Sequence, residues 1–405
     1  MPDQADYSFA IGPCRTGLRI FGSWPDPIIP LTQLDIFRSI IVSLTILIFG
    51  FIPQLSMAII VANARDWNGV IEILTTATVP FVVSLTKFNV SCYQRNVLKT
   101  LTTMMKDDWN DYHLDADLKF MQENAGLGRK ISQICLFLAL SVVIPHCLLT
   151  TVIYFVNWGE YGDLCLISYF PFETNRRPNY EIILVGQCFS LIFGASTHAI
   201  IDGFFSILVL HICSQFKILQ RQLSQLIENC RDAQHEKSFF EMLPKIIDRH
   251  DQLNRFVSLI DDSFNLMFLA QIMATATSLC FQGYQLVMVT SASENGISVL
   301  ELTQLVFFIG SYSSSLFVYC YVVEKLNYES YQLVNTIFSS GWYDLPSSVT
   351  KNLMLLMCRA QKPLEVTAGK FCYFSLEFYC RILKSTGGYI SMLLAVRDRL
   401  AEENQ

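Results

Sequence analysis

Long apolar blocks alternate with polar connections along the chain. Each block contains about 20 residues or more, and at about 1.5 Å per helical residue such a length crosses the ~30 Å hydrocarbon core of a membrane. The pattern therefore predicts seven transmembrane helices. They are expected at residues 40–62, 70–90, 134–156, 182–210, 264–289, 299–323 and in the final stretch 367–396.

The composition also indicates an all-α membrane protein. Of the 405 residues, 52% are hydrophobic and only 16% are charged, whereas soluble proteins average roughly 25% charged residues. Pro53, Pro80 and Pro145 interrupt three of the blocks, which membrane helices tolerate where neighbouring groups satisfy the freed carbonyls. The first 38 residues, with prolines and charges of both signs, lack the n-region and h-region of a cleaved signal peptide.

The basic residues predict the orientation of the spans. Of the 29 Lys and Arg residues, 21 fall on the side of the N-terminus and five on the opposite side. Because cytoplasmic connections carry the excess of positive charge, the N-terminus is expected in the cytoplasm and the C-terminus outside. A G-protein-coupled receptor has the opposite topology, and the Asp/Glu-Arg-Tyr and Asn-Pro-x-x-Tyr motifs of that class are missing from the expected places.

No motif of an enzyme or a metal site is recognisable. The 13 cysteines are scattered without the paired spacing of a zinc site, and most are expected to be small packing residues. Cys165 falls in an outer connection, where an oxidising compartment permits a disulfide to Cys147 or Cys188. His198 and Asp202 share one helix face, and a structural polar contact with the cytoplasmic region is favoured over a functional site.

The cytoplasmic connections have a helical pattern of their own. Between the fourth and fifth spans, apolar residues recur at helical intervals, among them Leu223, Leu226 and Leu253. This periodicity predicts helices that run beyond the bilayer at about residues 213–262. Together with the connection at about residues 93–131, they would form an intracellular helical layer.

The C-terminal quarter carries the most specific motifs, at residues 320–330, 339–346, 355–371 and 375–393. Their order and spacing resemble the C-terminal signature of the insect odorant receptors. The residues that carry the resemblance are Gly341-Trp342-Tyr343, Arg359-Ala360-Gln361-Lys362-Pro363, Ala368-Gly369-Lys370-Phe371 and Tyr389. The motifs cover roughly the last 90 residues, while length and seven-span topology extend the resemblance to the whole chain.

The resemblance implies an odorant receptor that is the ligand-binding subunit of a heterotetrameric, odorant-gated, non-selective cation channel. Its partners would be the odorant co-receptor subunit, a small volatile ligand and the lipid bilayer of the olfactory neuron dendrite, at the plasma membrane. No enzyme activity, cofactor, metal or nucleic acid is expected. The chain is too short to be the co-receptor. A gustatory receptor of the same superfamily is the nearest alternative, and a G-protein-coupled receptor or a transporter is less favoured.

The same resemblance divides the chain into regions. These are a cytoplasmic segment at residues 1–38, six spans with their extensions at 39–323, an anchor segment at 324–370, a pore helix at 371–396 and an extracellular tail at 397–405. Residues expected to contribute to the anchor or to subunit assembly are Trp342, Tyr343, Arg359, Glu377, Arg381 and Lys384.

The three charges near the start of the last helix need a polar environment. In lipid, Glu377, Arg381 and Lys384 would each cost about 2.5–3.5 kcal/mol, so this half of the helix is placed below the membrane. The alternative is a charged stripe buried against neighbouring helices. Residues expected to face the pore are Ser385, Gly388, Met392 and Ala395, the last two being at the gate.

An apolar cavity among the outer halves of spans two to six is the expected odorant site, because volatile ligands offer area and few hydrogen bonds. Depth and helical spacing select Thr78, Phe81, His146, Leu149, Thr150, Ser190, Phe193, Phe281, Tyr284, Phe308 and Tyr312. The polar side chains His146 and Tyr284 would matter most for an alcohol or acid, since an unpaired buried polar group costs about 1–3 kcal/mol.

Overall fold

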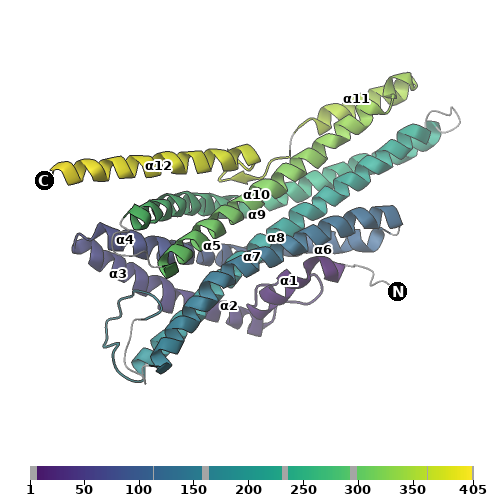
Figure 1. Ribbon diagram of the computed structural model, residues 1–405. Coiled ribbons are helices and arrows are strands. Elements are labelled where there is room, and N and C mark those ends of the chain that lie inside the picture. Colours follow the sequence, from purple (N-terminus) through teal and green to yellow (C-terminus); the bar gives the residue numbers. More distant parts are fainter. Residues whose placement is uncertain are drawn as a thin grey trace.

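The computed structural model describes residues 7–112, 114–156, 164–229, 236–291, 299–362 and 364–403. Its secondary structure is almost entirely helical, which confirms the all-α fold (Figure 1). The elements are α1 (Tyr7–Ile20), α2 (Gln33–Thr45), η1 (Ile46–Phe51), α3 (Ile52–Asn63), α4 (Trp67–Ile73), η2 (Leu74–Thr78), α5 (Val79–Tyr93), α6 (Arg95–Asp111), α7 (Asp115–Val156), α8 (Asn179–Asn229), α9 (Glu236–Ser291), α10 (Val299–Ser339), η5 (Trp342–Asp344), α11 (Ser347–Ala360), β1 (Thr367–Ala368), β2 (Cys372–Tyr373) and α12 (Leu376–Glu403).

Within the described part of the chain, six helical segments are long and apolar enough to cross a membrane. They are Gln33–Asn63, Gly69–Tyr93, Asp115–Val156, Asn179–Asn229, Phe239–Val289 and Leu305–Ser339. α12 is the seventh helix of spanning length, since its 28 residues correspond to about 42 Å. The direction in which the chain crosses the membrane stays a prediction.

The first two spans each contain a wide helical turn directly before a proline. η1 and η2 are π-helical, and Pro53 and Pro80 lie in the first turn of the α-helices that follow them. Because proline lacks the N–H that an α-helix uses at this point, the chain changes its hydrogen-bond spacing there and both spans continue as helices. Pro145 is accommodated within α7.

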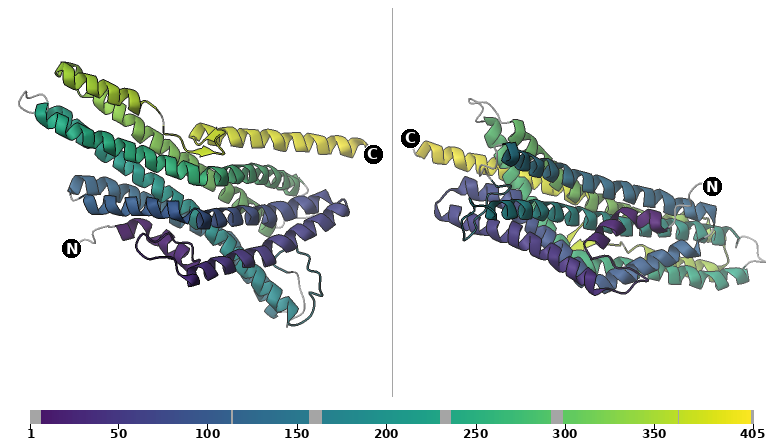
Figure 2. Two further views of the ribbon diagram at one scale, coloured as in Figure 1. Left: turned by 180° about the vertical axis from the view of Figure 1, so that it is seen from behind. Right: turned by 90° about the horizontal axis from the view of Figure 1, so that it is seen from below.

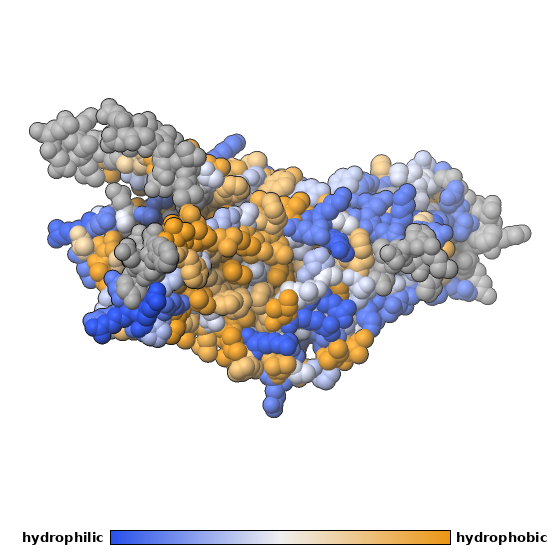
Figure 3. Space-filling view, turned by 60° about the horizontal axis from the view of Figure 1, so that its bottom comes forward, coloured by the Kyte–Doolittle hydropathy of each residue, from blue (hydrophilic) through white to orange (hydrophobic). Residues whose placement is uncertain are grey.

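α8 is the centre of the bundle. α5, α7, α9 and α10 all contact it (Figures 1 and 2). All of its most apolar 18-residue window is buried inside the protein, compared with 6% of the corresponding window of α7. α7 instead exposes large apolar side chains, among them Phe137, Ile144 and Leu148, as expected of a helix that faces lipid. Apolar residues cover one part of the molecular surface, and polar residues cover its other end (Figure 3).

Four of the described helices are much longer than a membrane is thick. α7, α8, α9 and α10 have 42, 51, 56 and 41 residues, or roughly 60–85 Å, against ~30 Å of hydrocarbon. Ion pairs join their polar ends to neighbouring helices: Asp108 of α6 pairs with Arg249 of α9 at 2.6 Å, and Asp117 of α7 pairs with Arg221 of α8 at 2.9 Å. The helices predicted to continue from spans four and five are therefore present, and their cytoplasmic location stays a prediction.

A small hairpin precedes the last helix. β1 and β2 pair antiparallel, with three residues between them. Gly369 and Lys370 have φ values of 61° and 63°, as the two central residues of a type I′ turn require, and the Phe371 N–H closes this turn on the Ala368 carbonyl at 3.1 Å. Asp261 of α9 holds the hairpin by accepting hydrogen bonds from the Thr367 backbone N–H and hydroxyl, both at 2.7 Å, and from Lys370 Nζ at 2.5 Å. The Ala-Gly-Lys-Phe motif is therefore the turn that docks the last helix onto α9.

This hairpin corrects the expected bounds of the last helix. The sequence predicts a pore helix at residues 371–396 and a tail at 397–405, but α12 begins at Leu376 and continues to Glu403. The start moves because residues 372–373 are used for strand pairing. α12 packs against α9 and α10 and projects away from the rest of the bundle (Figures 1 and 2).

Candidate functional site

Two adjoining cavities lie in the apolar half of the bundle, between η2–α5, α7, α8 and α10. The outer cavity has a volume of about 250 Å³ and the inner cavity about 110 Å³. Six residues line both of them, namely Thr76, Ala77, Val142, Val143, Leu191 and Phe308. The walls are therefore mainly apolar, as in sites for small, largely apolar ligands.

Polar side chains stand at the two ends of this space. The inner cavity is also lined by Ser84, His198 and Tyr312, and the outer cavity by Glu72 and His146. Hydroxyl and imidazole groups can each donate or accept a hydrogen bond. The space thus suits a small ligand with an apolar body and one polar group.

The connection between α7 and α8 roofs the outer cavity. Leu164, Cys165, Leu166 and Ile167 line it from this side. His146 Nε2 donates to the Cys165 carbonyl at 2.6 Å. Gln187 of α8 accepts from the Leu166 backbone N–H at 3.3 Å and donates to the hydroxyl of Ser168 at 2.7 Å. We call residues 164–168 the roof segment.

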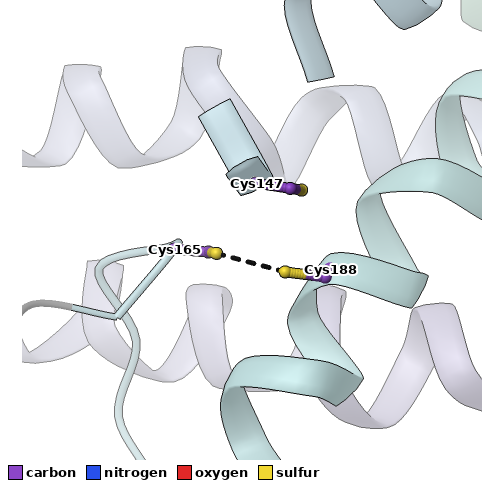
Figure 4. Close-up of side chains that lie close together, drawn as sticks. All are labelled: Cys147, Cys165 and Cys188. Carbon is purple, nitrogen blue, oxygen red and sulfur yellow. Dashed lines mark hydrogen bonds between the residues drawn. The ribbon is translucent and has the colours of Figure 1, made fainter. Parts of the chain in front are cut away.

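Three cysteines meet beside the roof segment. Cys147 of α7, Cys165 of the roof segment and Cys188 of α8 have sulfur atoms that all lie within 4.8 Å of one another (Figure 4). Cys165 and Cys188 are the pair drawn in contact, with 3.5 Å between their sulfurs. The sequence-based alternatives for a partner of Cys165 therefore both lie within its reach.

A buried ion pair forms the floor below the inner cavity. Lys87 Nζ of α5 lies 2.5 Å from Asp202 Oδ1 of α8, and their side chains are 0% and 1% exposed. Tyr319 of α10 donates its hydroxyl proton to Asp202 and accepts from Lys87 at 2.9 Å. His198 Nε2 lies 3.3 Å from Lys87 Nζ and 3.4 Å from Asp202 Oδ2. Since His198 also lines the inner cavity, this polar floor is in direct contact with the space for a ligand.

The floor differs from what the sequence suggests. His198 and Asp202 do share a helix face, but their partners are Lys87 and Tyr319 on neighbouring spans and not groups of the cytoplasmic region. The signal that could have identified the pair is Lys87 itself, a lysine inside an apolar block. A buried lysine needs a nearby anion, and Asp202 is an acid within another span.

The eleven predicted ligand contacts divide into two groups. Phe81, His146, Phe308 and Tyr312 line the two cavities. The remaining seven, which do not line them, are Thr78, Leu149, Thr150, Ser190, Phe193, Phe281 and Tyr284.

Local contacts explain several of the seven. Thr78 donates to the Ile73 carbonyl at 3.2 Å, and Thr150 donates to the His146 carbonyl at 3.0 Å. Leu149 is 41% exposed on the outer face of α7. Phe193 lines an open groove on the opposite face of α8. The lining residues that the sequence did not single out are chiefly the small or aliphatic ones, such as Ala77 and Val143.

The four predicted pore residues lie together on one exposed face of α12. They are Ser385, Gly388, Met392 and Ala395. The opposite face carries Thr386, which is buried, and Tyr379, whose hydroxyl is 2.8 Å from that of Ser313 on α10. In a single chain this leaves the predicted pore face uncovered, with Met392 64% exposed.

The predicted anchor residues are also accessible. Glu377 and Arg381 form the expected i, i+4 pair at 2.8 Å, with side chains 82% and 68% exposed, so the pair adds little stability. Lys384 and Arg359 are exposed as well. Trp342 is half-buried, and its carbonyl accepts from Thr350 at 3.2 Å. Tyr343, beside it, is 70% exposed.

Comparison with known proteins shows where this fold occurs. A family described as 7tm Odorant receptor matches residues 70–387. Odorant receptor 10 of Aedes albopictus is 25% identical over 221 residues, which are 55% of this chain and 57% of the relative. An odorant receptor coreceptor of Harpegnathos saltator is 24% identical over 152 residues, or 37% of this chain and 30% of the relative. The chain thus spans about half the length of the first of these relatives and less than a third of the second.

A solved structure has the same fold over nearly the entire chain. The insect olfactory receptor OR5 from Machilis hrabei, in complex with eugenol, aligns with a TM-score of 0.79 at 17% identity and covers 95% of this chain and 97% of its own. The fold is therefore that of a multi-pass membrane protein of this class. Since the family match takes in all spans from the second to the first half of α12, the resemblance seen in the C-terminal motifs is confirmed, and the chain belongs to the 7tm odorant receptor family.

Proposed function

We propose that this protein is the odorant-binding subunit of a ligand-gated cation channel. The observation that carries the proposal is the pair of adjoining cavities between η2–α5, α7, α8 and α10, with apolar walls and polar groups at both ends. A partly enclosed, largely apolar space inside a membrane bundle suits a volatile molecule that partitions out of water. The family relationship supports a receptor role for that space.

The ligand is a small molecule with an apolar body and one hydrogen-bonding group. Phe81 and Phe308 offer flat apolar surface, and His198, Ser84 and Tyr312 offer the polar end. The relative from Machilis hrabei binds eugenol, an aromatic phenol of this general chemistry. Eugenol is therefore a sensible first probe, followed by alcohols and esters of similar size.

The channel requires other subunits. The exposed face of α12 with Ser385, Gly388, Met392 and Ala395 supports a pore that is completed by the last helices of neighbouring chains, one or more of them the odorant co-receptor. The complex acts at the plasma membrane of the olfactory neuron dendrite, with its N-terminus in the cytoplasm. Trp342, Tyr343 and Arg359 lie on the polar end, where subunits would contact one another.

Patch-clamp recording from cells that express the chain with a co-receptor tests this proposal. Val143→Phe fills the wall shared by both cavities and should abolish or strongly weaken odorant-evoked cation currents. Leu148→Phe is the matched control, because Leu148 lies on the same helix and is 59% exposed. Currents should persist when G-protein signalling is blocked. Equal responses from both variants at equal surface levels would rule out the cavities as the odorant site.

A further inference from the structure

The three cysteines beside the roof segment have a chemistry that the odorant cavity does not use. Cys147 and Cys165 are buried, and Cys188 is half-buried. All three are free thiols in the structure, with Cys165 and Cys188 closest at 3.5 Å. Figure 4 shows that they approach one another from three separate segments, namely α7, the connection and α8. Such convergence allows either a metal site or a disulfide.

The donor set favours the disulfide. A structural zinc site is almost always closed by four Cys, His or carboxylate ligands. Among the described residues, the group contains three cysteines and no fourth such side chain. The connection that carries Cys165 is on the side opposite to the basic residues, which is the outer, oxidising side. Thiols that are this close together in such a compartment become oxidised.

We infer that Cys165 and Cys188 form a disulfide and that Cys147 is a thiol able to exchange with it. In the first step the two thiols lose two protons and two electrons to a protein disulfide of the secretory pathway, which is reduced to a dithiol. In the second step the Cys147 thiolate attacks the Cys188 sulfur, so that a Cys147–Cys188 bond forms and Cys165 leaves as a thiolate. The exchange has no net oxidation.

The two disulfides would differ in what they do to the roof segment. A Cys165–Cys188 bond ties the roof to α8, next to the hydrogen bonds that Gln187 makes with Leu166 and Ser168. A Cys147–Cys188 bond joins α7 to α8 and releases Cys165. Since residues 164–167 close the outer cavity, the first form holds the cavity shut and the second leaves its roof held by hydrogen bonds alone.

Mass spectrometry of the full-length receptor tests the bond without any odorant. Surface receptor is alkylated before lysis and digested without reduction. The wild type and Cys147→Ser should give a peptide linked through Cys165 and Cys188, and Cys165→Ser should give one linked through Cys147 and Cys188. Alkylation of all three cysteines would overturn the inference, as would one zinc per chain with the three thiols protected. Cys358→Ser, an exposed position on α11, is the control and should leave the linked peptide unchanged.

The role of the bond at the cavity is tested by a membrane-impermeant reductant applied outside the cell. This part rests on the proposed odorant response. The reductant should shift the half-maximal odorant concentration of the wild type and of Cys147→Ser, and should have no effect on Cys188→Ser. A shift of equal size in Cys188→Ser would show that another disulfide is responsible and would overturn the assignment to the roof.

Discussion

Replacing only Lys87 or only Asp202 should destabilise the folded receptor, whereas replacing both buried charges together should not. Both side chains are essentially inaccessible, and breaking a buried pair by removing one partner typically costs about 3–5 kcal/mol. The loss of stability in Lys87→Met should lie at the lower end of this range, because Tyr319 still donates a hydrogen bond to the remaining carboxylate of Asp202. The loss of stability in Asp202→Leu should lie at the upper end, because the buried ammonium group of Lys87 then has only the neutral side chains of Tyr319 and His198 as partners.

The double variant Lys87→Met/Asp202→Leu gives the decisive comparison. Replacing both charges by apolar groups of similar volume is often neutral or stabilising, so the two single losses should not add. A loss of about 3 kcal/mol changes a folding equilibrium by roughly a hundredfold. The expected order of stability is therefore wild type and double variant together, then Lys87→Met, then Asp202→Leu.

Folded receptor can be measured by fluorescence-detected size exclusion after heating in detergent, together with surface biotinylation. Lys119→Met, at an exposed lysine of α7, is the matched control and should behave as the wild type. The reasoning fails if the double variant is no more stable than the worse single variant. It also fails if both single variants match the control, since that would mean that the pair is hydrated in the membrane.

Three further changes address the hairpin, the pore and the assembly surface. Asp261→Ala removes the acceptor of three hydrogen bonds to the hairpin, and a hydrogen bond to a charged group contributes about 1.5–3 kcal/mol. We therefore expect reduced surface delivery, and normal delivery would contradict the docking role. A charged residue at both Met392 and Ala395 should change ion permeability or the leak current, because a narrow apolar ring gates by dewetting. The same change at the half-buried Leu393 should mainly affect packing. Unchanged ion selectivity at confirmed surface levels would show that Met392 and Ala395 do not face the pore. Arg359→Glu should lower surface delivery of the complex more than odorant sensitivity, and a shifted dose–response curve at normal surface levels would refute the assembly role. In all three cases surface biotinylation and whole-cell recording are the measurements.

The spans were predictable because their signal is carried by length and composition. A block of about 20 apolar residues is long enough to cross a membrane whatever structure the rest of the chain adopts. The start of the last helix was not predictable in this way, because the Thr367–Tyr373 hairpin is an apolar stretch whose turn depends on two left-handed residues and on Asp261 of another helix.

The ligand-lining faces were only partly predictable. In a soluble helix the apolar face identifies the interior, but both faces of these spans are apolar, so periodicity does not separate the cavity from lipid. Phe81 and Phe308, which depth selects, line the cavities, whereas Phe193 and Leu149 lie on faces of their helices that are turned away from them. The charges of Lys87 and Asp202 within two apolar blocks suggest that they pair, but the contact of both with Tyr319 depends on how three spans pack together.

The contrast between α8 and α7 bears on how such receptors can diversify. In α8, where the whole apolar window is enclosed, each side chain is fitted to several neighbours, and a change of even one methylene group is felt. In α7, where 6% of the window is fully enclosed, the other positions are partly buried or exposed to lipid, so their side chains are constrained by fewer neighbours. Val142, Val143 and His146 lie on this permissive helix and border the cavities. Under the proposed function, substitutions along α7 would therefore change the range of ligands while α8 preserves the fold.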